Sequence, residues 1–349
     1  MDREKLERLR SRYAEAKGGD IFDPDFRRVA DLQFKGTERR KWPFMDPATF
    51  LSAPFRPEAG SEGFSDLDVA LVGVPLDLGV TNRTGARLGP RARRGVERIG
   101  PYEHVLRVAP LGEARVADIG DVPFRSRFSL ADCHADIERH FCALREAGVR
   151  TLAVGGDHSI SLPILRGLAG GRPLGLVQID AHCDTAGEYE GTKFHHGGPF
   201  RQAVLEGLLD PDRTVQIGIR GGAEYLWEFS YESGMTVIHA EEVDEIGIPA
   251  VVERMRAVLG DGPVYVTFDV DGLDPAFAPG TGTPEAGGLT PREAQRLLRG
   301  LAGLDIVGGD VVEVAPQYDP STVTAQIAAQ VLFTLLCLVV RAPSFRAAG

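Results

Sequence analysis

Short apolar runs alternate with longer amphipathic segments from about residue 68 to the end of the chain. Several runs are apolar nearly throughout, which is typical of parallel strands covered on both faces. Helical patterns at 136–148, 200–209 and 251–260 separate some of them. This alternation predicts an α/β fold with three layers, α/β/α, and a mainly parallel central sheet. The predicted strands lie at 69–75, 151–156, 174–180, 214–220, 236–240, 264–270 and 306–314.

Two further segments have clear helix signals. Thr290 can cap a helix whose first turn holds Pro291, and Glu293 completes a capping box. The apolar stretch from Ile327 to Val340 contains Gln330 and is too short to span a membrane. We therefore expect a capped helix from Pro291 and a core helix over 327–340.

The first part of the chain has a different character. It is rich in Arg, Asp, Pro and Phe and shows no clear period. We interpret residues 1–65 as an N-terminal arm, which either packs on the main domain or a neighbouring subunit or is partly disordered. Residues 66–349 show no linker or internal repeat and are expected to form one catalytic domain.

The net charge of −11 and the pI near 5.3 argue against a nucleic-acid partner, which requires a concentrated positive face. The four cysteines match no zinc motif and no CxxC pair. The charged first ten residues lack the apolar core of a signal peptide. We therefore expect a cytoplasmic protein with reduced thiols and no membrane partner.

Acidic residues and histidines cluster where four of the predicted strands end. Because the carboxyl ends of parallel strands share one edge of a sheet, these clusters should converge on one site. They are Asp157-His158, the segment 180–184 with Asp180, His182 and Asp184, the pair Asp269 and Asp271, and Glu313.

So many buried carboxylates would be costly without cations. Residues at i, i+2 and i+4 of a strand face one side, so each cluster can point into a common cavity. The set is too rich in oxygen for a structural zinc site and suits Mn²⁺, while Ni²⁺ also accepts mixed ligands. Two ions sharing these ligands would leave room for an activated water. The six predicted ligands are His158, Asp180, His182, Asp184, Asp269 and Asp271.

The motifs resemble those of the ureohydrolase family, which includes arginase, agmatinase, guanidinobutyrase and guanidinopropionase. The resemblance runs from about Asp68 to the C-terminus and is specific in combination. It rests on GVTNRTGARLGPR (79–91), GGDHS (155–159), DAHCD (180–184), FDVDGLDPAFAPGTGTPEAGGLT (268–290) and VEVAPQYD (312–319).

The resemblance implies a binuclear amidinohydrolase, a hydrolase of C–N bonds in linear amidines that releases urea. It places His158 and Asp184 on one ion, His182 and Asp271 on the other, and Asp180 and Asp269 between them. The same comparison makes His196 the proton shuttle and Glu313 the carboxylate that binds the guanidinium group. His195, which precedes His196, is a second candidate for the shuttle or a substrate contact.

The segment from Lys193 to Glu242 most resembles a branch that acts on very small guanidines. This favours guanidine, an N-alkylguanidine or a biguanide such as metformin as substrate, with nickel as metal. The alternatives are 3-guanidinopropionate or 4-guanidinobutanoate, followed by agmatine and arginine. A guanidino acid would need a cation for its carboxylate, and Arg83, Arg87 and Lys193 are candidates. Trp227 could cover a cationic substrate.

The sequence fits three other classes of protein less well. A metal-binding partner subunit without activity would not need the complete ligand set and His196. A binuclear phosphatase typically uses an asparagine ligand, and Asn82 is the only asparagine of the chain. A deacetylase of this fold would use one zinc. The family resemblance also implies a homo-oligomer, a trimer or a hexamer, with a heteromer containing a paralogous subunit as the alternative.

Overall fold

The computed structural model describes residues 2–34, 45–57, 63–64, 66–96 and 99–347. The chain divides into two compact units, Met1–Arg40 and Lys41–Gly349. The first unit contains α1 (Arg3–Tyr13) and α2 (Pro24–Phe34). Phe50 and Leu51, within the predicted arm, are buried in the core of the second unit. The predicted boundary after residue 65 stays a prediction.

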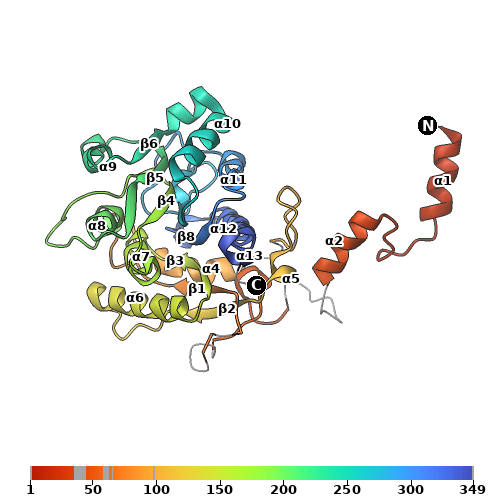
Figure 1. Ribbon diagram of the computed structural model, residues 1–349, viewed down its shortest axis with the longest axis horizontal. Helices are drawn as coiled ribbons and strands as arrows, with labels where there is room; N and C mark the ends of the chain where they lie inside the picture. The colour runs from red at the N-terminus through yellow and green to blue at the C-terminus, as the bar shows by residue number, and fades with distance from the viewer. Residues whose placement is uncertain (1, 35–44, 58–62, 65, 97–98, 348–349) are drawn as a thin grey trace. The chain divides into compact units, whose positions relative to one another are not determined.

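An eight-stranded sheet forms the centre of the second unit (Figure 1). Its order is β2-β1-β3-β8-β7-β4-β5-β6, and every pair of neighbours is parallel. The seven predicted strands are all present, which confirms the predicted fold class. The strands are β1 (Val69–Val74), β2 (Val116–Asp121), β3 (Arg150–Gly155), β4 (Leu174–Ile179), β5 (Leu209–Ile219), β6 (Thr236–His239), β7 (Val264–Asp269) and β8 (Ile306–Val312).

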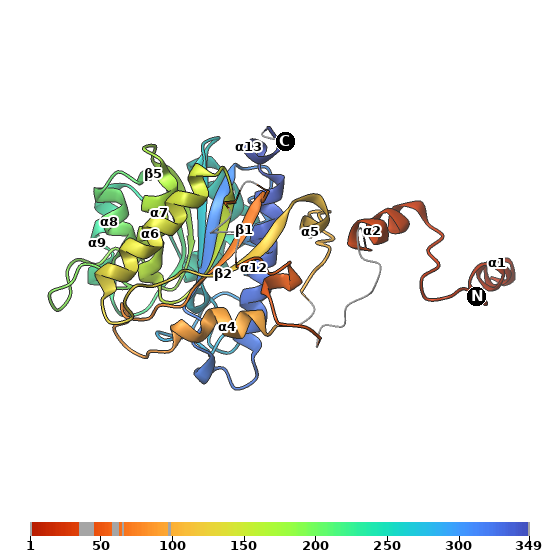
Figure 2. The same cartoon turned by 90° about the horizontal axis from the view of Figure 1, so that it is seen from below.

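Helices cover both faces of this sheet (Figures 1 and 2). On β1, Val69 and Leu71 join one buried cluster, whereas Ala70 and Val72 join the other. This alternation explains why the strand is apolar throughout. The first cluster packs under α10 (Ala240–Leu259), α11 (Pro291–Arg299) and α12 (Val323–Arg341). The second packs under α6 (Leu130–Glu146), α7 (Ser161–Ala169) and α8 (Pro199–Leu205).

The two helices expected from sequence signals are confirmed. The Thr290 hydroxyl accepts from the Glu293 amide, and the Glu293 carboxylate accepts from the Thr290 amide, so the capping box at α11 is complete. Helix α12 is long and apolar enough to cross a membrane, but 78% of its most apolar window is buried inside the protein. This burial matches the core helix that the sequence predicts.

Sequence patterns missed β2, which lies at the edge of the sheet. Its run contains Asp118, a buried carboxylate that Arg94 contacts through two nitrogens at 2.8 and 2.9 Å. Within the described residues, the shorter helices are η1 (Phe50–Ser52), η2 (Ala86–Leu88), α4 (Gly89–Arg94), α5 (Pro110–Glu113), η3 (His158–Ile160), η4 (Glu224–Leu226), α9 (Glu228–Ser233), η5 (Val270–Gly272), η6 (Pro316–Tyr318) and α13 (Pro343–Ala347).

Candidate metal centre

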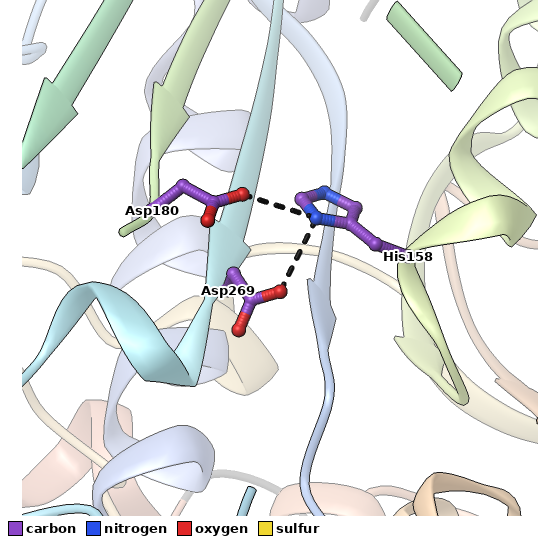
Figure 3. Close-up of side chains that lie close together, drawn as sticks. All are labelled: His158, Asp180 and Asp269. Atoms are coloured by element: carbon purple, nitrogen blue, oxygen red, sulfur yellow. Dashed lines mark ion pairs between the residues drawn. The ribbon is translucent and has the colours of Figure 1, made fainter. Parts of the chain in front are cut away.

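The predicted ligands meet at the carboxyl edge of the four central strands, β3, β8, β7 and β4. Figure 3 shows three of them, His158, Asp180 and Asp269, with their polar atoms turned toward one another. His158 lies in η3 after β3, Asp180 follows β4, and Asp269 ends β7. Strands distant in sequence therefore deliver one ligand each to a single point, as the parallel topology requires.

His158 Nδ1 is the centre of the first group of ligands. It lies 3.2 Å from Asp180 Oδ2, 2.9 Å from Asp184 Oδ2 and 3.2 Å from Asp269 Oδ2. All four side chains are buried. Asp184 reaches this point from a left-handed backbone conformation with φ of 51°, which is uncommon for a residue other than glycine and turns the chain sharply after β4.

His182 Nδ1 is the centre of a second group. It lies 3.2 Å from Asp271 Oδ2 and 3.6 Å from Asp180 Oδ1. Asp180 thus contributes one oxygen to each group. Two sets have the spacing of metal ligands: His158, Asp180 and Asp269, and Asp180, His182 and Asp271. The His182 side chain is 28% exposed, so this second group lies nearer to solvent than the first.

The chemistry of these residues fits two divalent cations. His158 Nδ1 is fully buried and makes no hydrogen bond to the part of the chain that the structure describes, although three carboxylates lie close to it. Burial, together with the charges of Asp271 and Asp180, raises the pKa of Asp269 well above its ordinary value. Without cations the site would therefore hold protonated or mutually repelling carboxylates. Bound cations would remove both costs.

Hydrogen bonds hold the shared ligand Asp180 in place. Its Oδ1 accepts from the His182 amide at 2.7 Å, and its Oδ2 accepts from Gln178 Nε2 at 2.8 Å. The Gln178 amide group is in turn oriented by Gln216, whose Nε2 donates to Gln178 Oε1 at 2.6 Å. Each oxygen of Asp180 keeps one lone pair that no protein donor occupies in these contacts. The carboxylate is therefore suited to bridging two ions.

Glu313 and His196 lie side by side at the predicted substrate site. Glu313 follows β8 with φ of 63° and is 1% exposed. Its Oε1 accepts from the His158 amide at 2.9 Å and from His196 Nδ1 at 2.8 Å, while its buried Oε2 has no hydrogen-bond partner among the described residues. An unoccupied buried carboxylate oxygen is a ready acceptor for the N–H groups of a guanidinium ion.

Thr81 completes the surroundings of His196. The Thr81 hydroxyl lies 2.7 Å from His196 Nε2, and the Thr81 amide donates to the same nitrogen at 3.0 Å. Burial opposes protonation of His196, but the Glu313 carboxylate outweighs burial and raises the pKa of His196 to about 9. The arrangement keeps a proton on this imidazole beside the guanidinium-binding oxygen.

The three remaining predicted residues have other contacts. Arg87 forms an ion pair with the buried Asp77. His195 Nε2 bonds the Gly187 carbonyl at 2.7 Å, so the ring holds the loop before His196. Trp227 packs with its ring 4.7 Å from that of His239. Contact of Arg87, His195 and Trp227 with a substrate stays a prediction.

Several polar residues of the site were not predicted. Gln178, Thr267 and Asp310 lie inside apolar strand runs and are fully buried. Their signal was available in the sequence, because a polar residue within a buried strand requires a partner.

Cys183, between two ligands, was expected to serve packing, and it lies in a small apolar cluster with Ile219 and Val237.

Comparison with known proteins agrees with this geometry. Residues 67–337 match the model of the arginase family. The chain is 52% identical over 277 residues to guanidinopropionase from Pseudomonas aeruginosa, covering 78% of this chain and 87% of that protein. It is 47% identical over 277 residues to mitochondrial agmatinase from Gallus gallus, covering 78% and 81%.

A solved structure shows the same fold. Proclavaminate amidino hydrolase from Streptomyces clavuligerus superposes with a TM-score of 0.80 at 36% identity, covering 86% of this chain and all of that one. Enzymes of the arginase family use a binuclear metal centre and hydrolyse guanidino C–N bonds. The extent of the sequence match, the parallel sheet and the two ligand groups at its edge together show that this chain belongs to the arginase family.

Proposed function

We propose that the protein hydrolyses a short guanidino acid, 3-guanidinopropionate, to urea and the corresponding amino acid. The observation that carries this proposal is the 52% identity to a guanidinopropionase over 78% of the chain. Guanidine, alkylguanidines and biguanides, which the sequence analysis favoured, find no support among the relatives compared above. The guanidino acids that it gave as alternatives are better supported.

The guanidinium group would bind Glu313. Its free Oε2 faces Gly282, since a Cβ at that glycine would lie 3.8 Å from Oε2 and 2.8 Å from the Arg83 carbonyl oxygen. The missing side chain leaves space at the oxygen that binds the substrate. A charge-assisted, planar contact at Oε2 would fix the orientation of the guanidinium carbon.

The proposed ligands would hold two divalent cations, Mn²⁺ or Ni²⁺, which lower the pKa of a water and stabilise negative charge in the tetrahedral species. His196 would provide the proton that the departing amine needs, because an amide anion is a very poor leaving group. Glu313 keeps a proton on His196, and this proton lies on Nδ1, because Nε2 accepts from the Thr81 amide.

The carboxylate of a guanidino acid requires a cation near the mouth of the site. Arg83 is a suitable candidate, because its carbonyl oxygen lies beside Gly282, the glycine next to Glu313 Oε2. Its guanidinium group donates to the carbonyls of Thr281 and Gly282 at 3.0 and 3.2 Å and lies 4.4 Å from the Tyr318 ring. These contacts hold the guanidinium in place before the substrate arrives.

Agmatine is the second candidate substrate. The carboxylate of Glu285 is 40% exposed and lies 4.0 Å from His182 Nε2, where it could hold the amino group of agmatine. The 47% identity to an agmatinase is consistent with this alternative. The tail of 3-guanidinopropionate is a carboxylate and that of agmatine is an ammonium group. Substitution of Arg83 should therefore affect the first substrate, and substitution of Glu285 the second.

The localisation, oligomeric state and partners of the enzyme are also proposals. We expect a cytoplasmic homo-oligomer, a trimer or a hexamer, that acts without a nucleic acid or a membrane. A heteromer with a paralogous subunit, in which this chain only binds metal, is the alternative of another class. Complete ligand groups together with His196 and Glu313 support the catalytic role.

A substrate panel tests the proposal. Metal-loaded protein is assayed for urea release from 3-guanidinopropionate, 4-guanidinobutanoate, agmatine, arginine, guanidine and metformin. We expect the highest kcat/KM with 3-guanidinopropionate. A higher value for agmatine, lowered by Glu285→Gln and not by Arg83→Met, would establish the second candidate. A higher value for guanidine or metformin would overturn the guanidino-acid proposal.

A further inference from the structure

Asp310 is a buried carboxylate that the proposed reaction does not use. It lies within β8 and is 0% exposed. Three hydroxyl groups donate to it: Ser161 Oγ at 2.6 Å and Tyr265 OH at 2.7 Å to Oδ2, and Thr267 Oγ1 at 2.5 Å to Oδ1. A carboxylate in such a position is costly to bury. Its burial therefore depends on the three hydroxyl donors around it.

Thr267 connects this carboxylate to the metal centre. Its Oγ1 also lies 2.7 Å from His158 Nε2. A threonine hydroxyl has one proton, and here Asp310 accepts it. The oxygen can therefore only accept from the histidine, so His158 Nε2 must carry hydrogen. The opposite tautomer would place two lone pairs against each other at this short distance.

The proton on Nε2 determines what the other nitrogen can do. In the neutral imidazole, Nδ1 then has a free lone pair. Nδ1 is the atom that faces Asp180, Asp184 and Asp269, and it has no hydrogen bond within the described ranges. The edge of His158 also meets the ring of Phe200 at a centroid distance of 5.1 Å, which restricts rotation of the imidazole. The ring is thus held in the state that a cation requires.

We propose that Asp310 is a positioning residue that acts through Thr267 to fix the tautomer and orientation of His158 for metal binding. The proposal rests on the metal centre proposed above. It extends a familiar arrangement, in which a carboxylate accepts from a metal-bound histidine, by one intervening hydroxyl group. Two consequences follow. Loss of the Thr267 hydroxyl should weaken metal binding, whereas loss of the Tyr265 hydroxyl, which also donates to Asp310, should not.

The test compares three substitutions in the full chain. Thr267→Val removes the hydroxyl at nearly constant shape, and Thr267→Ser retains it. Tyr265→Phe is the matched control, because it removes a different buried hydroxyl from Asp310 and leaves the contact between Thr267 and His158 intact. Dissociation constants for Mn²⁺ are measured by competition with a chelator, and melting temperatures are measured with and without Mn²⁺.

We expect Thr267→Val to weaken binding of Mn²⁺ by about 10- to 100-fold, whereas Thr267→Ser and Tyr265→Phe stay within about threefold of the wild type. The rise in melting temperature on adding Mn²⁺ should shrink in Thr267→Val alone. A purely structural role would lower the melting temperature of apo and loaded protein equally in both hydroxyl deletions and leave the dissociation constant unchanged. That outcome would overturn the proposal.

Asp310→Asn provides a second variant if Thr267→Val does not fold. An amide NH₂ turned toward Thr267 would reverse the direction of both hydrogen bonds and favour hydrogen on His158 Nδ1, so Mn²⁺ binding should weaken. Unchanged binding in Asp310→Asn would also contradict the proposal. Urea release by the wild type is a separate readout, so absence of activity with normal metal binding would reject the proposed function and leave this inference standing.

Discussion

Replacement of Glu313 by Gln examines the proposed substrate contact most sharply. Glu313 Oε1 accepts two hydrogen bonds from the protein, from the His158 amide and His196 Nδ1. In Glu313→Gln the amide oxygen must occupy this position, which places the NH₂ group where Oε2 stood. A donor would then face the N–H groups of the guanidinium ion. The variant therefore loses a charge and gains a repulsive contact with little change in size.

The size of the effect follows from the burial of this carboxylate, which is 1% exposed. Loss of one partner of a buried charge pair costs about 2–5 kcal/mol, which corresponds to a fall of about 30- to 5,000-fold in kcat/KM. The melting temperature should change little, because two effects of the Glu313 charge oppose each other. The charge stabilises protonated His196, and it repels the buried Asp157, whose pKa burial and Glu313 together raise to about 6.

The assay is urea release from 3-guanidinopropionate, with melting temperature measured in parallel. Asp319→Asn is the matched control, because it also converts a buried carboxylate to an amide, at a position where the carboxylate accepts from the Ala325 amide at the start of α12. It should lower stability and leave kcat/KM nearly unchanged. A Glu313→Gln enzyme with kcat/KM within about threefold of the wild type would refute the assignment of Glu313 to the guanidinium group.

Further predictions concern the proton donor, the substrate tail, the metals and pH. His196→Asn should lower kcat by about 10²- to 10⁴-fold with a small change in KM, measured by steady-state kinetics; an unchanged kcat would exclude His196 as the shuttle. Arg83→Met should raise KM for 3-guanidinopropionate more than for guanidine. Dialysis against a chelator should abolish activity and lower the melting temperature, and Mn²⁺ or Ni²⁺ should restore both. Burial, aided by the charge of Arg166, lowers the pKa of His134 to about 3. The stability that neutral His134 contributes is therefore present above pH 6.5 and is lost as the pH falls toward 3. Between pH 6.5 and 5, the free energy of unfolding of His134→Gln, measured by denaturant titration, should fall by about 2 kcal/mol less than that of the wild type.

The strands that carry the ligands were predictable because their signal is local. The runs at 151–156, 174–180 and 264–270 are apolar nearly throughout, and an acid or a histidine lies at the end of each run or within two residues of it. Because helices connect these strands, the strands should run parallel, and the carboxyl ends of parallel strands lie at one edge of the sheet. The ligand set could therefore be predicted from the sequence, although the ligands come from strands that are distant along the chain.

Side chains that rely on distant partners were harder to interpret. β2 was missed because its Asp118 looks unsuited to a buried strand until Arg94 is placed beside it. Arg87 is a candidate for the substrate carboxylate, and in the structure it forms an ion pair with Asp77, a partner that the sequence pattern does not indicate. Long flexible side chains take the partner that tertiary structure supplies, and periodicity contains no information on that choice.

The contact from Asp310 through Thr267 to His158 shows the same limit. Asp310 stands out in the run IVGGDVV as a carboxylate that needs a partner. The sequence does not show that Thr267, on the neighbouring strand β7, supplies it. Register between β7 and β8, which places Thr267 opposite Asp310, brings the two side chains together.

The most direct test of the central claim is a titration of apo protein with Mn²⁺, in which urea release from 3-guanidinopropionate is measured against the number of ions bound per chain. A binuclear amidinohydrolase predicts that activity rises until two ions are bound and then stays constant. Two bound ions without urea, from this substrate or from the rest of the panel, would contradict the account and indicate a metal-binding subunit that needs a catalytic partner.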